Sequence, residues 1–138
     1  MDALFEKLAG GAAVSSEILS IKGRDLRVPV TAQDIARISF SDVCERPLGA
    51  EDYLQLAGAY HTLFLENVPR MGYDRHNEAK RFMILIDSLY EQGVKLVISA
   101  ETAPEKLYTG REHAFEFKRT ISRLHEMRGA DYLRRRLP

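Results

Sequence analysis

The sequence contains very little cysteine, no excess of either charge and no long hydrophobic run. Cys44 is the only cysteine among 138 residues, so no disulfide can form within the chain and no oxidising compartment is required. Lysine plus arginine and aspartate plus glutamate both number 20, which removes the global field that would attract nucleic acid. The longest apolar run, residues 82–86, is far too short to cross a bilayer. These absences predict a cytoplasmic protein with no nucleic-acid partner and no integral membrane segment.

Length and composition predict one ordinary globular domain. Apolar residues make up 45% and charged residues 29% of the chain, the balance of a sequence that buries a single core. We expect residues 1–15 to form a tail helix and a connector from an upstream region, and residues 16–138 to form a single α/β domain. The basic run 134–136 is typical of a solvated terminal tail.

The first part of this domain alternates apolar and polar residues as β-strands do. Two such stretches, residues 17–21 and 26–30, flank a Lys-Gly-Arg-Asp turn and predict a β-hairpin. Pro29 has no amide proton to donate, so we expect the second strand at an edge of the sheet or near its own end. Residues 36–40 predict one more short strand. The hairpin is then either an antiparallel addition to the sheet or a separate flap.

From residue 50 onward, helical and strand-like patterns alternate. Apolar residues recur every three or four positions over residues 50–60 and 79–90, which predicts two helices. Apolar runs over 61–65 and 95–100 predict strands, and the second has the composition of a strand covered on both faces. An amphipathic helix follows from residue 117. The order predicts an α/β fold: a small, largely parallel or mixed sheet with packed helices, an N-terminal β-hairpin and a C-terminal amphipathic helix.

The chain carries no complete nucleotide-binding or catalytic motif. A phosphate loop needs Gly-x-x-x-x-Gly-Lys before Ser or Thr, because backbone amides wrap the phosphates and the lysine reaches the terminal one. No glycine here precedes a lysine. The Ile-Leu-Ile-Asp run at 84–87 resembles a magnesium-coordinating strand, but its periodicity favours a helix. The four histidines lack metal-ligand spacing and Cys44 is typical of a small buried residue, so we expect no metal site and no catalytic residue.

Two arginines are the candidate site residues. Arg119 and Arg123 lie one helical turn apart, opposite the apolar stripe of the C-terminal helix, and could together grip a phosphate or a carboxylate. The alternative is structural. Glu116 precedes Arg119 by three residues and Glu126 follows Arg123 by three, which is the spacing of surface ion pairs on one helix. The spacing of these residues does not decide between an anion-binding pair and surface ion pairs.

Six strings of residues along the chain carry a resemblance to a known family. They are FSDVCERPLGA at 40–50, DYL at 52–54, AKRF at 79–82, LIDSLY at 85–90, VKL at 94–96 and FEFKRTISRLHEM at 115–127. Together these strings resemble the C-terminal part of the ZapE-type, AFG-like AAA+ ATPases, over residues 23–133. Members of that family carry their phosphate loop, magnesium site and first sensor upstream, so the chain resembles a C-terminal fragment that lacks the phosphate loop.

The resemblance implies a part of an ATP-driven remodelling protein that assembles into homo-oligomeric rings. It implies ATP and Mg as cofactors of the full-length protein, none bound by this chain alone, and the upstream ATPase domain as a partner. Bacterial members of the family are linked with cell division and its tubulin-like ring protein, and mitochondrial members with protein quality control, so the resemblance implies a protein client such as a cell-division protein. Arg123, and after it Arg119, are implied to sense the terminal phosphate.

The alternative function is a stand-alone interaction module that recruits a client protein. Under this hypothesis the surface loops 66–77 and 103–113 make the contact, because connecting loops often carry recognition. A free-standing enzyme has the least support, since no nucleophile, base and oxyanion donor can be assembled from local motifs.

Overall fold

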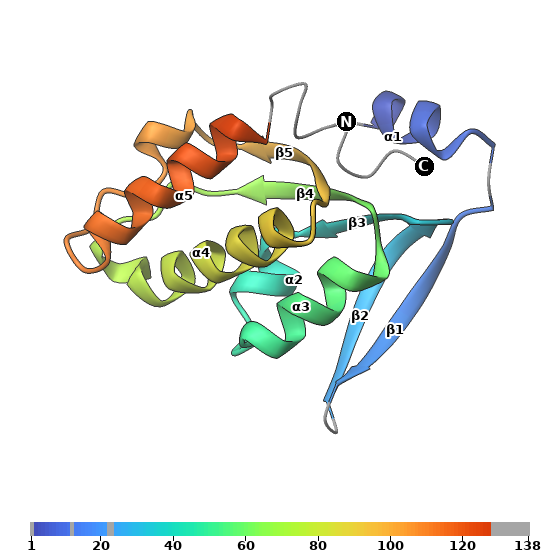
Figure 1. Ribbon diagram of the computed structural model, residues 1–138, viewed down its shortest axis with the longest axis horizontal. Helices are drawn as coiled ribbons and strands as arrows, with labels where there is room; N and C mark the ends of the chain where they lie inside the picture. Colours follow the sequence, from blue (N-terminus) through green and yellow to red (C-terminus); the bar gives the residue numbers. More distant parts are fainter. Residues whose placement is uncertain (1, 12, 22–23, 128–138) are drawn as a thin grey trace.

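The computed structural model describes residues 2–11, 13–21 and 24–127 of the chain (Figure 1). Its strands are β1 (Ser15–Ile21), β2 (Arg24–Ala32), β3 (Ile35–Ser39), β4 (Thr62–Val68) and β5 (Lys95–Ala100). Its α-helices are α1 (Asp2–Ala9), α2 (Phe40–Cys44), α3 (Ala50–Ala59), α4 (His76–Glu91) and α5 (Ala114–Glu126), with short 3₁₀ turns η1 (Tyr73–Arg75) and η2 (Pro104–Lys106). The expected basic tail at 134–136 lies outside the described residues.

The five strands form one mixed sheet in the order β1-β2-β3-β4-β5. β1 pairs with β2 and β2 with β3 in antiparallel fashion, whereas β3, β4 and β5 are parallel. The predicted α/β fold with an N-terminal hairpin and a C-terminal helix is confirmed. Of the two places considered for the hairpin, the structure selects the sheet, and in Figure 1 the last part of β1 and the first part of β2 project beyond the helices.

Pro29 does not mark an edge strand, so that part of the expectation is wrong. β2 lies between β1 and β3. The register with β1 shifts between Ser15 and Glu17, opposite this part of β2, and pairing with β3 begins only at Val30. A proline is tolerated at such an irregularity because no regular ladder bond is lost there.

The third strand ends one residue earlier than predicted, because Ser39 starts a helix. Its hydroxyl accepts a hydrogen bond from the Asp42 amide at 3.2 Å, and the Asp42 carboxylate faces the Ser39 amide in return. This capping box begins α2, which turns Phe40 into the core. The predicted helix over 84–87 is confirmed, since these residues lie inside α4.

Helices cover the two faces of the sheet unequally. Alternate residues of β4 show this: Leu63 and Leu65 join the large core under α2 to α5, while Phe64 joins a small cluster under α1. That small cluster comprises Phe5, Ala32, Ile35 and Phe64, with Ala9, Val30 and Val97 packed against it. In the part of the chain that the structure describes, no helix is long and apolar enough to span a membrane.

β5 differs from its sequence-based expectation. The run Leu96, Val97 and Ile98 predicts a strand covered on both faces, but the structure places β5 at the edge of the sheet. Leu96 and Ile98 contact the large core and Val97 the small cluster, yet each of the three side chains stays partly exposed. The composition of β5 is therefore that of an interior strand, and its position is not.

Candidate functional site

The candidate arginines are placed by α5, which packs on α4. Phe117, Thr120 and Leu124 form the buried stripe of α5 and anchor it. Arg119 and Arg123 lie off this stripe, at the positions that the helical period assigns to the border with α4. The helix–helix contact therefore brings both guanidinium groups to one side chain of α4.

That side chain is Asp87. The Arg119 guanidinium donates from Nη2 to Asp87 Oδ2 at 2.9 Å, and the Arg123 guanidinium donates from Nη1 to Asp87 Oδ1. A second carboxylate one turn further along α4 approaches Arg123, with 3.5 Å between Arg123 Nη2 and Glu91 Oε1. Two arginines thus share one carboxylate across the helix interface.

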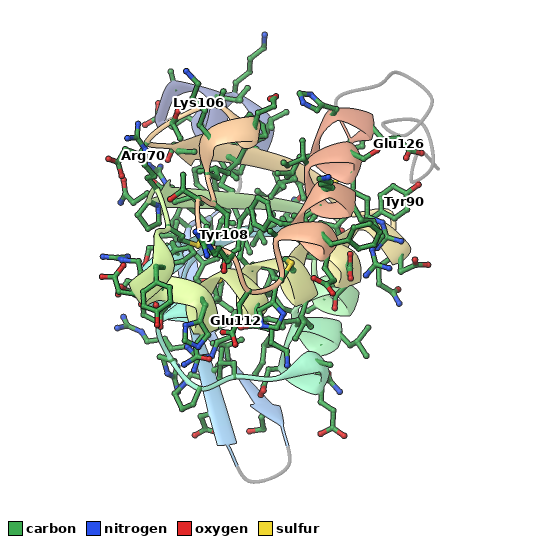
Figure 2. All side chains as sticks on the ribbon, turned by 90° about the vertical axis from the view of Figure 1, so that its left-hand side faces the viewer. Arg70, Tyr90, Lys106, Tyr108, Glu112 and Glu126 are labelled. Atoms are coloured by element: carbon green, nitrogen blue, oxygen red, sulfur yellow. The ribbon has the colours of Figure 1, made fainter. Side chains whose placement is uncertain are left out.

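Arg123 is held more firmly than Arg119. Its guanidinium carbon lies 4.6 Å from the centre of the Tyr90 ring, a cation–π geometry, and its side chain is only 20% exposed. The Tyr90 hydroxyl donates to Glu126 Oε1 at 2.8 Å, so the ring is fixed from both sides, and Figure 2 shows these two residues next to each other. Arg119 is 63% exposed, and its ion pair is with Asp87. Arg119 can therefore change partners with much less disruption.

The ion pairs of the two arginines are not those that spacing within α5 suggested. Spacing pointed to Glu116 and Glu126, whereas Arg119 and Arg123 pair with Asp87 and Glu91 on α4. Sequence reasoning missed Asp87 as a site residue. The sequence does contain a signal, because two acidic residues, Asp87 and Glu91, and two basic residues, Arg119 and Arg123, are each spaced by one helical turn. Only the packing of α4 on α5 shows that the acidic pair faces the basic pair.

A hollow of about 320 Å³ opens beside this cluster. It is lined by Leu54, Asp87, Ser88, Glu91, Arg119 and Arg123. Two arginines balance two carboxylates here, so the hollow has no large excess of positive charge. The Asp87 carboxylate nevertheless occupies the position of an oxyanion between two guanidinium groups, which shows that the arginines can receive such a group.

Cys44 is a buried core residue, as expected from the sequence. Burial raises the pKa of its thiol well above the ordinary value, so the reactive thiolate is disfavoured. The Arg81 guanidinium donates to the Cys44 carbonyl at 3.0 Å and ties α4 to the end of α2. Among residues 2–11, 13–21 and 24–127, no group of three metal-ligating side chains gathers.

The two loops considered for client binding lie side by side. The Met71 amide donates to the Leu107 carbonyl at 2.6 Å, and the Thr109 amide donates to the Met71 carbonyl at 2.9 Å, which forms a parallel bridge between the loops. The Tyr108 hydroxyl donates to the Glu112 carbonyl, and Figure 2 shows both residues on this side of the molecule. The bridge makes the two loops one surface.

This chain is similar to known proteins over nearly its whole length. Residues 1–136 match the protein family described as AFG1-like ATPase. The chain is 39% identical over 135 residues to the cell division protein ZapE of Escherichia coli K12, covering 98% of this chain and 36% of ZapE. It is 31% identical over 166 residues to the lactation elevated protein 1 homolog B of Danio rerio, covering 96% and 33%. It thus spans about a third of the length of these relatives, and no solved structure matches it significantly.

Proposed function

Since the chain belongs to the AFG1-like ATPase family, we propose that it forms a C-terminal, non-catalytic domain of an ATP-hydrolysing AAA+ protein. Its sequence has no phosphate loop, so the ATP and Mg of the whole protein are bound by other residues. Within this chain, Arg119 and Arg123 fit a phosphate oxygen, because their guanidinium groups already hold the carboxylate of Asp87 between them. The whole protein is cytoplasmic and acts as a homo-oligomeric ring.

One observation carries this proposal: two arginines of α5 converge on the single carboxylate of Asp87 at the edge of an open hollow. A phosphate group presents oxygens in a similar arrangement and carries more negative charge. We propose that it competes with Asp87 for the guanidinium groups, first for exposed Arg119 and then for Arg123. The cluster would then report the nucleotide state to α4 through the released Asp87.

A phosphate sensor differs from an ordinary ion pair in that phosphate competes with Asp87 for the two arginines. Two variants of the full-length protein test this competition. Arg123→Ala should lower ATP turnover about tenfold or more, because it removes a positive charge from the phosphate. Asp87→Asn should leave turnover close to the wild-type value, because both arginines remain. The measurement is steady-state phosphate release, with thermal unfolding as the check on folding. If the two variants lose turnover equally, the cluster only stabilises the contact between α4 and α5.

The chain by itself should neither bind nor hydrolyse ATP. Calorimetry with ATP and magnesium measures ATP binding. It is applied to the 138-residue chain and to the polypeptide that includes an upstream phosphate loop. Heat of binding is expected from the longer polypeptide alone. Tight binding by the short chain would mean that it holds a nucleotide site of another kind.

A second candidate function is client recruitment by the joined loops 66–77 and 103–113. The observation in its favour is the exposure of two aromatic side chains there: Tyr73 is 82% exposed and Phe115, just after the second loop, is 80% exposed. His76 connects the two sides, since its Nε2 lies 3.3 Å from Glu112 Oε2. Exposed aromatic groups on a rigid surface are frequent anchors of protein interfaces.

The client is sought among proteins of cell division, because the similar Escherichia coli protein ZapE is a cell division protein. Co-sedimentation with the purified tubulin-like division protein tests the surface. Tyr73→Ser together with Phe115→Ser should abolish binding, while Leu54→Ser, an exposed residue of α3, should preserve it. Equal binding by both variants would exclude the loop surface.

A further inference from the structure

The outer edge of β5 lacks the features that protect an edge strand. Such strands usually carry charged residues, proline or a bulge, which stop another chain from pairing with their free backbone groups. β5 has a lysine only at its first position, Lys95, followed by Leu96, Val97 and Ile98. Within the described ranges no strand pairs with this edge, because β5 ends the order of the sheet.

The opposite edge of the same sheet shows what protection looks like. β1 carries Ser15, Ser16, Glu17 and Ser20 among its seven residues, and its register shifts between Ser15 and Glu17. Polar side chains along an edge strand oppose the addition of a further strand. The sheet therefore has one protected edge strand, β1, and one unprotected edge strand, β5.

The backbone groups at the free edge of β5 can be identified. The Lys95 amide donates to the His61 carbonyl, and the Glu101 amide donates to the Val68 carbonyl, both at 2.8 Å. Successive residues of a strand direct their backbone groups to opposite sides, so odd-numbered residues of β5 face β4. Leu96 and Ile98 consequently direct their amide and carbonyl groups to the open edge.

An apolar pocket of about 660 Å³ lies beside β5. The residues around it come from β5, from η2 with its flanking residues, and from the end of α5 with the residue that follows it. They include Leu96, Ile98, Leu107, Leu124 and Met127. A strand paired with β5 would direct alternate side chains to this side of the sheet. A single added strand could therefore form hydrogen bonds with the free edge of β5 and place its apolar side chains in this pocket.

From the unprotected edge and the adjoining pocket, we infer that β5 is an interior strand in the whole protein. A β-strand with alternating apolar residues, supplied by the part of the polypeptide outside these 138 residues, pairs with Leu96 and Ile98 and fills the pocket. The length of the relatives supports this occupant, since the chain aligns with only 36% of ZapE. The inference rests on the proposal that the chain is one domain of a longer protein.

Amide hydrogen exchange tests the pairing residue by residue. It is measured on the 138-residue chain and on the longer polypeptide of the same coding frame. We expect the Leu96 and Ile98 amides to exchange at least ~100-fold more slowly in the longer polypeptide, because they gain hydrogen bonds. The Lys95 and Val97 amides, which face β4, should be protected in both and serve as internal controls.

The other possible occupants give different outcomes. Protection in the short chain that grows with protein concentration would assign the edge to a second copy. Protection that is independent of concentration and lost on removal of residues 128–138 would assign it to the end of this chain. Equal exchange in both polypeptides, or a coding frame of 138 residues alone, would make β5 a true edge. Each of these outcomes overturns the inference, and none depends on ATP binding, so the nucleotide proposal is judged separately.

A pair of substitutions on the two edges gives a second test. Ile98→Lys should lower the urea midpoint of the longer polypeptide clearly more than that of the short chain, because the charge would enter an occupied pocket. Ile18→Lys, at a β1 residue that is 64% exposed, is the matched control and should change both midpoints equally little. An equal decrease in the two polypeptides for Ile98→Lys would contradict the inference.

Discussion

The face of the sheet that carries α2 to α5 and the face that carries α1 bury very different amounts of apolar surface. Under the four helices, a continuous core includes Phe40, Tyr53 and Phe82, all essentially inaccessible to solvent. Under α1 the cluster is small, and its central contact is the edge-to-face pair of Phe5 and Phe64, with ring centres 5.4 Å apart. The fold therefore depends mainly on one face.

Polar contacts on the α1 face support the same distinction. Arg37 on β3 forms an ion pair with Glu66 on β4, and its guanidinium lies 5.6 Å from the centre of the Phe5 ring. Leu4 and Leu8 of α1 remain about half exposed. An eight-residue helix is too short to be stable alone, so α1 depends on its few tertiary contacts. The comparison shows one face that four helices cover and one face that is only thinly covered.

The largest expected effect is a difference between two phenylalanine truncations. Phe82→Ala should destabilise the chain by about 3–5 kcal/mol, because a buried ring is lost from the large core. Phe5→Ala should cost roughly 1–2 kcal/mol, because α1 can detach without unfolding the sheet. Urea unfolding followed by circular dichroism measures both. Equal losses would show that the α1 face is as important to global stability as the helical face.

Alkaline pH should lower the stability of the fold by an intermediate amount, through two buried groups on the face that carries α2 to α5. Burial raises the pKa of the Cys44 thiol and of the Tyr53 hydroxyl above their ordinary values of 9.0 and 10.0. The unfolded chain loses these protons near the ordinary values while the folded chain keeps them, so stability is complete below about pH 9 and falls as the pH rises further. Each group contributes a loss of about 1.4 kcal/mol per pH unit above its unfolded pKa.

Urea midpoints between pH 8 and pH 10.5 measure this decline. Cys44→Ala should reduce the slope, because the thiol no longer distinguishes the folded from the unfolded state. Tyr73→Phe is the matched control at an exposed tyrosine and should leave the slope unchanged. A stability that rises with pH over this range would contradict the assignment of Cys44 and Tyr53 as buried neutral groups.

The smallest expected effect concerns the exposed part of α1. Leu8→Glu should change the stability of the 138-residue chain by no more than about 0.5 kcal/mol, because the side chain is half exposed. Leu56→Glu, at a buried position of α3, is the matched change on the helical face and should prevent folding or nearly so. A large loss for Leu8→Glu would mean that α1 is covered by other residues of the chain in solution.

Much of the fold could be predicted from local pattern. The helix period of 79–90 and the alternation in the hairpin depend on neighbouring residues, and both elements appear where expected. The boundary at Ser39 was missed because the capping box competes with strand propensity over a single residue. Pro29 was misplaced because the register shift, in which residues 29 and 30 of β2 lie opposite the single residue 16 of β1, depends on the pairing of two strands and not on a local pattern.

The candidate site was predictable in part. Arg119 and Arg123 can be selected from the sequence because a spacing of four residues places them on the same side of any helix. Their partner could not be selected in this way, because Asp87 precedes Arg119 by 32 positions. Whether the arginines respond to phosphate stays a prediction that the turnover of the two variants decides.

By itself the sequence determined the order of helices and strands, the absence of a phosphate loop and the pair of arginines on one helix, since each of these follows from residue types at short spacing. Only the tertiary structure decided that Asp87 lies between the two arginines and that β5, despite its apolar composition, is at the edge of the sheet. The physical reason is that helix packing and strand order depend on contacts between residues far apart in the chain, which no local pattern contains.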